Sequence, residues 1–133
     1  SSSAQVTSGS AQEDFINTEV SHTCATNASY VVYEITAQWF CEPDANNSMF
    51  YMDLWEKIGD TWSKMGTGYR WSEDLRNLDN QSLMSCSLKL PAYTGTRSYK
   101  LRVRSYNTSK QATLNEDEDG NHFDPIVKIY SVL

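Results

Sequence analysis

Long apolar runs are absent from this chain of 133 residues: no stretch approaches the roughly 18 to 20 apolar residues that a membrane-spanning helix needs. We therefore expect no membrane span. Basic residues are also few, because 11 Lys and Arg stand against 17 Asp and Glu and give a formal charge of −6. Nucleic-acid binding requires a clustered basic surface, so this balance argues against a nucleic-acid partner. A chain of this length is expected to form one domain.

The sequence motifs of common enzyme classes are missing as well. There is no Gly-x-Ser-x-Gly, no His-Glu-x-x-His, no phosphate loop and no Gly-x-Gly-x-x-Gly. A pair of carboxylates of the glycosidase kind stays open, because spacing along the chain does not report distance in space. With no positive sign of catalysis, the sequence predicts that the protein is not an enzyme.

Cysteine is scarce too. The three residues Cys24, Cys41 and Cys86 allow at most one intramolecular disulfide. Two interpretations stay open, because each falls on a buried position of a predicted strand: small buried hydrophobes, or one bridge plus a free thiol. If the first two predicted strands form a hairpin, Cys24 and Cys41 lie about 30 Å apart. A disulfide between those two is then excluded, since bridged Cα atoms lie within about 7 Å.

The clearest pattern that is present is the alternation in residues 98–107. Tyr99, Leu101 and Val103 share one face of a predicted strand, and cationic or aromatic residues share the other. Six further segments alternate in the same way and are predicted strands: 19–26, 30–41, 49–58, 61–69, 82–90 and 123–133. Inward positions are assigned in all of these except 61–69: Val20, His22, Cys24, Val31, Tyr33, Ile35, Ala37, Trp39, Cys41, Phe50, Met52, Leu54, Met84, Cys86, Leu88, Leu90, Phe123, Val127, Ile129 and Leu133.

Seven short strands without a helix of ordinary length predict an all-β domain. We expect a two-sheet antiparallel β-sandwich of the immunoglobulin or fibronectin type III kind, with a closed barrel as the alternative. The first two strands are expected to form a hairpin across 26–29, and one or two helical turns are expected in 72–78. Residues 1–14 have the composition of a flexible leader, which leaves 15–133 as the domain.

Several segments carry a resemblance to known proteins. Cys24 ahead of a strand, the apolar strand 50–57, the turn with Trp62, and the late strand 98–106 together resemble small secreted β-sandwich proteins of Gram-positive bacteria, whose function is uncharacterised. The same late strand resembles the penultimate strand of fibronectin type III domains, in which Tyr-x-Leu-x-Val recurs. The paired cysteines and Trp-Ser-x-Trp-Ser box of cytokine receptors are missing, which argues against a receptor.

One face of a predicted sheet is the candidate ligand site. The third, sixth and seventh predicted strands are expected to lie side by side, with Lys57, Lys100, Lys128 and Tyr130 beside the candidate ligand-binding residues. Those candidates are Tyr51, Asp53, Trp55, Arg102, Arg104 and Tyr106. Aromatic rings beside charged groups suit sugars, and Trp, Tyr and Arg also suit a protein partner. The structural alternative is that Asp53 and Lys57 pair with Arg102 and Arg104 across strands.

The acidic stretch 115–124 is a candidate calcium loop. Oxygen-bearing residues at Asn115, Asp117, Asp119 and Asn121, with Gly120 at the turn, match the first half of a calcium-binding loop. Ile126 occupies the twelfth position, where an EF-hand has Glu, so an EF-hand is excluded and a bound ion needs a further ligand from elsewhere. The alternative is a solvated acidic loop without a metal. No other cofactor is expected.

Two further features complete the prediction. The connection that holds Trp62, Tyr69 and Trp71 is either core packing or the lip of a ligand site. Asn-x-Ser/Thr sequons begin at Asn27, Asn46, Asn80 and Asn107, all in or beside predicted turns. The abundance of Ser, Thr, Asn and Tyr favours an exported protein. We expect a secreted or cell-surface, non-catalytic interaction domain that binds a glycan or an extracellular protein; the alternative is an adhesion or structural module with a calcium-stabilised loop.

Overall fold

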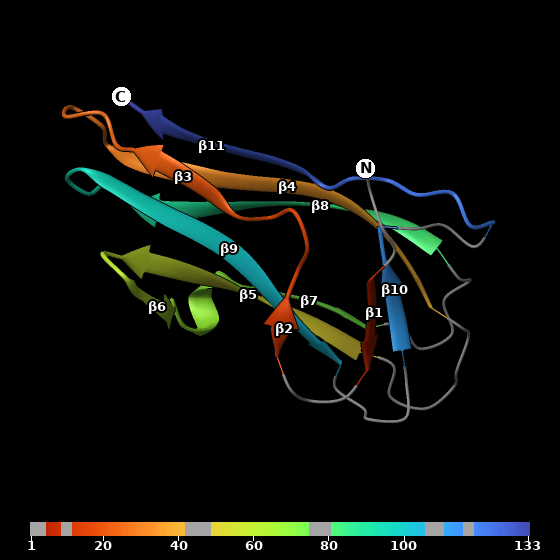
Figure 1. The fold of residues 1–133 in the computed structure, drawn as a ribbon. Helices are drawn as coiled ribbons and strands as arrows, with labels where there is room; N and C mark the ends of the chain where they lie inside the picture. Colours follow the sequence, from red (N-terminus) through yellow and green to blue (C-terminus); the bar gives the residue numbers. More distant parts are fainter. Residues whose placement is uncertain (1–4, 9–11, 42–48, 75–80, 106–110, 116–118) are drawn as a thin grey trace.

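The computed structural model describes residues 5–8, 12–41, 49–74, 81–105, 111–115 and 119–133 (Figure 1). These residues form eleven strands and one short 3-10 turn, η1 (Thr67–Tyr69), without an α-helix. The strands are β1 (Gln5–Ser8), β2 (Glu13–Asp14), β3 (Val20–Thr23), β4 (Tyr30–Cys41), β5 (Met49–Ile58), β6 (Thr61–Lys64), β7 (Arg70–Asp74), β8 (Gln81–Pro91), β9 (Thr96–Ser105), β10 (Gln111–Leu114) and β11 (Ile126–Val132). The prediction of an all-β protein is confirmed.

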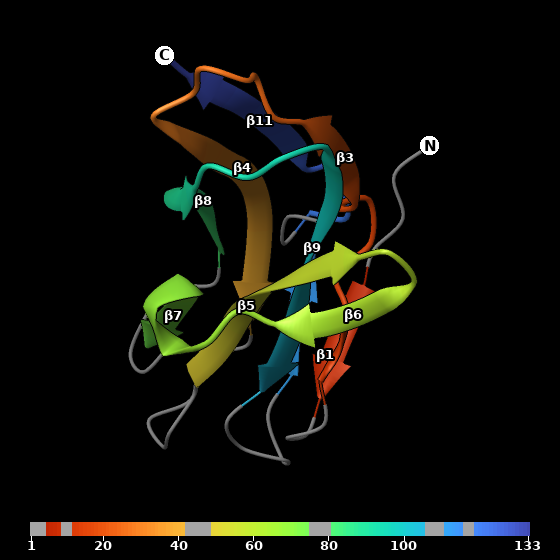
Figure 2. The ribbon, with the colours of Figure 1, turned by 90° about the vertical axis from the view of Figure 1, so that its left-hand side faces the viewer.

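The strands form two antiparallel sheets, as Figures 1 and 2 show. The first sheet is built around β4, which pairs with β8 along one edge and with β11 and β10 in succession along the other; β1 extends it beyond β10. The second sheet is built around β9 and β5. On the far side of β9 lie β2 and β3, and on the far side of β5 lie β6 and β7.

One core lies between the two sheets. Its largest fully buried side chains come from both: Tyr33, Tyr99, Phe15, Ile35, Met52, Leu54, Leu90, Leu114, Val31 and Val103. Strand alternation produces this core, because successive side chains point to opposite faces and the inward positions of β4, and of the middle of β5 and β9, are apolar. The predicted inward positions of these strands are confirmed wherever the structure describes their side chains, from Val31 to Ala37, at Met52 and Leu54, and from Tyr99 to Val103. The two sheets sharing one core fit a sandwich-like arrangement.

A buried hydrogen-bond network connects the sheets at Thr18. The Tyr33 hydroxyl, from β4, donates to the carbonyl oxygen of Thr18 at 2.8 Å, and the Leu101 amide, from β9, donates to the Thr18 hydroxyl at 3.1 Å. The Thr18 hydroxyl in turn donates to the carbonyl of Phe15 at 2.8 Å. Thr18 is fully buried. These bonds satisfy backbone groups in the short irregular segment between β2 and β3, where no ladder partner exists for them.

The predicted hairpin between the first two strands is wrong. β3 pairs with β9 in the second sheet, whereas β4 is the centre of the first. Residues 24–29 therefore cross from one sheet to the other, and the Ser29 amide donates to Val132 at 2.7 Å after the crossing. A short polar connection suits a hairpin and a sheet change equally, so the local sequence does not decide between them. The disulfide argument built on that hairpin falls with it; Cys24 and Cys86 are free thiols.

Strand β11 is also placed differently from the prediction. It pairs with β4, residue Val127 opposite Ile35, and not with the strands β5 and β9. Lys128 and Tyr130 consequently lie on the first sheet, far in topology from the candidate ligand-binding residues. Phe123 and Leu133, which were expected in the core, are 45% and 74% exposed because they flank β11 instead of packing between the sheets.

Three local predictions need adjustment. The Gly59-Asp60 turn joins β5 to β6 as predicted, with Gly59 at φ 63°, but the strand ends at Lys64 and η1 follows. Residues 72–74, expected to start a helical turn, belong to β7 because they pair with β5; residues 75–78 lie outside the described part. Within the predicted leader, residues 5–8 form β1, which pairs with β10, and residues 13–14 form β2, which pairs with β9.

Candidate functional site

Most of the chain's cations gather on the outer face of the second sheet. Tyr51 lies opposite Arg104, Asp53 opposite Arg102 and Trp55 opposite Lys100, so the alternating strands β5 and β9 place these side chains together, as predicted. Neighbouring strands add further residues to the same side. We call the following set the cationic face: Tyr51, Trp55, Lys57, Trp62, Lys64, Arg70, Lys100, Arg102 and Arg104. It holds six of the chain's 11 Lys and Arg.

Aromatic rings and cations alternate across the cationic face. The guanidinium carbon of Arg104 lies 4.6 Å from the Tyr51 ring centroid, and that of Arg70 lies 5.2 Å from the same ring. The guanidinium of Arg102 lies 4.8 Å from the Trp55 ring. Each contact is a cation–π interaction worth about 0.5 to 1 kcal/mol at an exposed site.

The same arrangement continues at the other end of the face. The Lys100 ammonium lies 4.3 Å from the Trp62 ring centroid, and that of Lys57 lies 5.9 Å from it. The three rings are half-buried. The chain's own cations thus lie over the faces of all three rings.

Asp53 is the internal anchor of this face and not an exposed contact. Its side chain is fully buried and receives the Arg70 guanidinium, Nε at 2.7 Å from Oδ1 and Nη2 at 3.5 Å from Oδ2. The Lys64 ammonium lies 3.8 Å away, and the Gln12 amide donates to Oδ2. The hydrogen bond to Asp53 raises the pKa of Arg70. The predicted pairing of Asp53 with Arg102 across strands is thus replaced by pairing with β6 and β7, because a buried carboxylate needs close cations.

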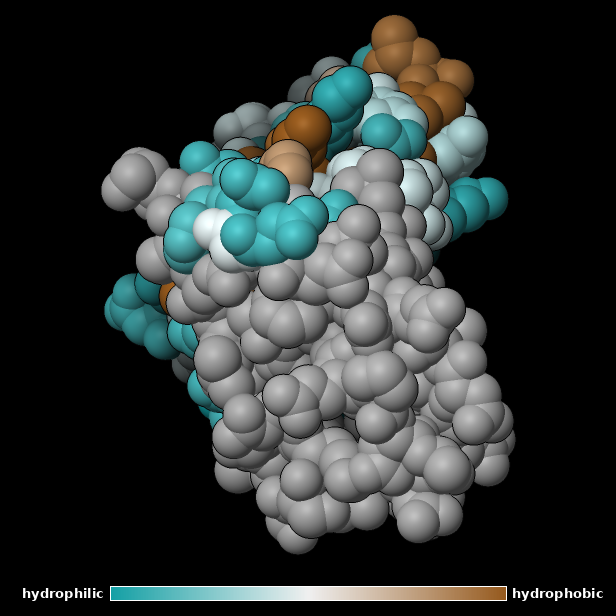
Figure 3. Space-filling view, turned by 90° about the vertical axis from the view of Figure 1, so that its right-hand side faces the viewer, coloured by the Kyte–Doolittle hydropathy of each residue, from teal (hydrophilic) through white to brown (hydrophobic). Residues whose placement is uncertain are grey.

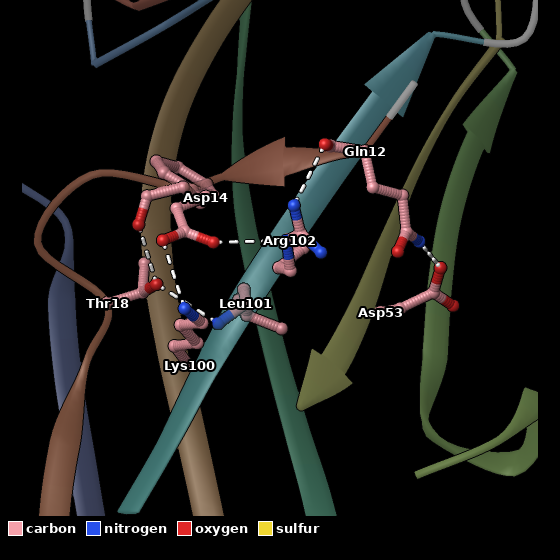
Figure 4. A network of polar contacts seen from close by, with 8 residues as sticks. Gln12, Asp14, Thr18, Asp53, Lys100, Leu101 and Arg102 are labelled. Carbon is pink, nitrogen blue, oxygen red and sulfur yellow. Dashed lines mark hydrogen bonds and ion pairs between the residues drawn. The ribbon is translucent and has the colours of Figure 1, made fainter. Parts of the chain in front are cut away.

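Strand β2 places an acid on the same face (Figure 4). Asp14 lies opposite Arg102 in the ladder, and its carboxylate lies 3.0 Å from Lys100 Nζ and 3.0 Å from Arg102 Nε. The carbonyl oxygen of Gln12 accepts a hydrogen bond from Arg102 Nη2 at 3.0 Å. In Figure 4 the Gln12 side chain reaches from the end of β2 across to Asp53 on β5.

One donor on the cationic face lacks a hydrogen-bond partner. In the part of the chain that the structure describes, Trp55 Nε1 is buried without one. Arg102 Nε is buried as well, but it lies 3.0 Å from Asp14 Oδ1 in an ion pair. Buried donors are normally satisfied, so the Trp55 indole N–H is the exception on this face.

The calcium-loop residues are only partly described. Asp117 lies outside the described residues, and Asp119 and Asn121 are exposed. Asn115 is buried and has φ 65°. Its backbone amide donates to the Gln38 carbonyl at 2.8 Å, and its backbone carbonyl accepts from the Phe123 amide at 2.9 Å. Its side-chain amide has no hydrogen-bond partner among the described residues. Gly120, at φ 82°, makes the expected turn. No group of three His, Cys, Asp or Glu residues suited to a metal occurs within the described ranges.

The remaining predicted residues are divided between core and face. Trp62 belongs to the cationic face, and Tyr69 packs against the core. Trp71 lies opposite Met52 in the ladder, and Tyr106 falls outside the described part. Sequence reasoning missed Gln12, Asp14, Lys64 and Arg70: Lys64 lies in the predicted strand 61–69, whose faces were not assigned, and the other three lie outside the predicted strands.

Figure 3 shows, among its coloured atoms, a hydrophobic group at the upper right and a smaller one to the left of it, with hydrophilic atoms between them. No helix among the described residues is long and apolar enough to cross a membrane. No family model matches the chain, and no curated protein matches it.

Proposed function

We propose that the protein is a non-catalytic interaction domain whose cationic face binds a carboxylate-rich segment of a partner protein. The observation that carries this proposal is the alternation of cations and rings on one face of a protein whose formal charge is −6. Arg and aromatic residues are enriched where proteins bind tightly, and a guanidinium held on a ring presents its N–H donors in a fixed direction. We further propose a secreted or cell-surface setting and a sandwich of the immunoglobulin or fibronectin type III kind.

The ring faces favour a protein partner over a glycan. A sugar stacks its C–H face on an open aromatic face. Here Tyr51 has guanidinium groups at 4.6 Å and 5.2 Å, and Trp62 has an ammonium group at 4.3 Å. The cationic face offers guanidinium and ammonium donors, and carboxylates accept from such donors in charge-assisted hydrogen bonds. Glycan binding that is lost in Trp55→Ala would overturn this preference.

A titration followed by nitrogen-15 NMR tests the proposal. The probe is an alternating Glu-Thr octapeptide, with a Gln-Thr octapeptide of the same length as the uncharged control. We expect shifts confined to β5, β6, β7, β9 and the adjoining β2, and affinity that falls with added salt because the contacts are ionic. Arg104→Gln should weaken binding about tenfold, which is the loss of one charge-assisted hydrogen bond.

Lys89→Gln is the matched control for that variant. Lys89 lies 4.4 Å from the Tyr30 ring, but on the first sheet. The variant Lys89→Gln also removes one positive charge from a cation–π contact. Because that contact lies on the first sheet, the variant should leave the affinity for the octapeptide nearly unchanged. Equal losses in both variants would mean that only net charge matters and that the cationic face is not the site.

A calcium-stabilised loop is the second candidate, supported by the buried Asn115 amide oxygen without a partner. Asn115, Asp119 and Asn121 are the described residues that can contribute oxygens there. Calcium should then raise the melting temperature more than magnesium does, because binding to the folded state alone stabilises it. A melting temperature that does not respond to calcium would remove this candidate.

A further inference from the structure

The position that a partner's carboxylate would take on the cationic face is already held by an acid of the chain. Asp14 bridges Lys100 and Arg102, both at 3.0 Å, and its own side chain is 57% exposed. Carboxylates of exposed ion pairs are held weakly, because solvent screens the attraction.

The strand that carries Asp14 is short. β2 comprises Glu13 and Asp14 alone, and its ladder with β9 consists of two residue pairs. The next residue, Phe15, is still bonded to β9, because its backbone amide donates to the Leu101 carbonyl at 2.9 Å; the chain then makes the irregular segment around Thr18 and pairs with β9 again from Val20. Gln12–Asp14 is held by this ladder, by the Asp14 ion pairs and by the hydrogen bonds of Gln12 to Arg102 and Asp53. A peptide that replaces Gln12–Asp14 must make up these contacts, while the buried network at Phe15 and Thr18 keeps the following chain in place.

What β2 covers is suited to an acidic strand. Its removal uncovers one edge of β9 beside Lys100 and Arg102, and it frees the Arg102 guanidinium from the Gln12 carbonyl. An extended peptide can add to such an edge through main-chain hydrogen bonds while its side chains select the register. Beside that edge, the buried Trp55 Nε1 lacks an acceptor, and Arg102 Nε, which lies 3.0 Å from Asp14, would be left for the carboxylate that takes the place of Asp14.

We infer that β2 is an internal competitor for the partner: an extended acidic segment of the partner replaces Gln12–Asp14 along β9 and sets its own carboxylate between Lys100 and Arg102. This inference rests on the proposed function and adds to it the partner's conformation, its chemistry and its point of entry. The chain thereby limits binding to segments that outcompete Asp14.

Asp14→Asn, titrated with the Glu-Thr octapeptide by fluorescence anisotropy at low salt, tests the competition. Loss of two exposed ion pairs should tighten binding about threefold to tenfold. Asp124→Asn is the matched control, because it removes one negative charge from an exposed position ahead of β11. It should change the affinity less than about twofold, since screening weakens the effect of distant charges. An equal gain in both variants would overturn the inference.

A structural readout distinguishes replacement from a general charge effect. Asp14 and Arg102 are directly opposite in an antiparallel ladder, so their backbone protons give a cross-strand nuclear Overhauser effect. Saturation with the octapeptide should remove that signal and create one between peptide and Arg102. Persistence of the Asp14 signal in the saturated complex, with binding still lost in Arg104→Gln, would overturn the competition alone. Absence of binding by both the unmodified chain and Asp14→Asn would overturn the proposed function as well.

Discussion

The outer faces of the two sheets share one backbone pattern but differ in chemistry. On the first sheet, small hydroxyl residues such as Thr36 and Ser85 lie between single polar contacts; Tyr130 donates to Glu34 at 2.7 Å and Lys89 lies over Tyr30. On the second, long cations and rings cover one another above a buried carboxylate. Small hydroxyl side chains are enough to keep the outer face of the first sheet hydrated. The second sheet instead buries the charge of Asp53, which costs free energy that a merely hydrated surface does not require.

The largest effect should come from the anchor of the cationic face. Asp53→Ala leaves Arg70 and Lys64 around an empty buried position, so the free energy of unfolding should fall by about 3 to 5 kcal/mol. Glu34→Gln on the first sheet should cost at most about 1 kcal/mol, because that contact is exposed. Urea unfolding measures both. Similar losses would show that the two faces do not differ in the way their contacts indicate.

A pair of threonines compares the buried network beside the second sheet with the outer face of the first. Thr18→Val removes a buried hydroxyl that donates to Phe15 and accepts from Leu101, at an expected cost of about 1 to 3 kcal/mol. Thr36→Val, on the outer face of the first sheet, loses only a 3.5 Å contact with Ser85 and should remain within about 0.5 kcal/mol. Chemical denaturation of the two variants tests this. A harmless Thr18→Val would mean that the buried network contributes little.

The pKa values of tyrosine side chains differ between the core and the outer face of the first sheet in their effect on stability at high pH. Burial raises the pKa of Tyr99, and its hydrogen bond to Glu56 raises it further; burial is also the main cause that raises the pKa of Tyr33. The folded state thus keeps protons that the unfolded chain releases above about pH 10, so stability is complete below that pH and falls as pH rises. The slope should reach up to about 1.4 kcal/mol per pH unit for each residue.

Phenylalanine variants measure these slopes one at a time. Tyr99→Phe should flatten the loss of stability at high pH, because the variant has no proton to release. Tyr130→Phe should flatten it less: a hydrogen bond to Glu34 raises the pKa of Tyr130, but the side chain lies at the surface. Urea unfolding between about pH 9 and pH 11 gives both slopes. A steeper dependence on Tyr130 than on Tyr99 would contradict the comparison.

The sequence predicted side-chain faces well and strand partners poorly. Alternation in β5 and β9 was sufficient to place Tyr51, Trp55 and Arg104 on one outer face, since the period of two is set by the backbone. It did not report which strands are neighbours, because the same alternation suits either sheet. The hairpin and the position of β11 failed for that reason.

The site residues that the sequence did not predict were missed for the same reason. Arg70 follows η1, and Asp14 sits in a strand of two residues, so neither has a repeating pattern around it. Their roles follow only from topology: β7 passes beside Asp53, and β2 passes beside Arg102. The one available signal was a count of charges. In the observed register of β5 with β9, Asp53 lies opposite Arg102 with Lys100 and Arg104 on either side, which identifies a candidate anchor but not its partner.

The smallest expected effect compares two lysines with nearly equal ring contacts. Lys100 lies 4.3 Å from Trp62 and Lys89 lies 4.4 Å from Tyr30. Replacement by Met keeps the apolar stem and removes the charge, so each cation–π contact should cost about 0.5 to 1 kcal/mol in unfolding free energy. Lys100 also pairs with Asp14 at 3.0 Å. Its variant should therefore cost a few tenths of a kcal/mol more than that of Lys89.

Because Asp14→Asn removes the same ion pair, Lys100→Met should lose its excess cost in that background. An excess that persists there would assign it to the cationic face itself and would show that β2 contributes no stability through this pair.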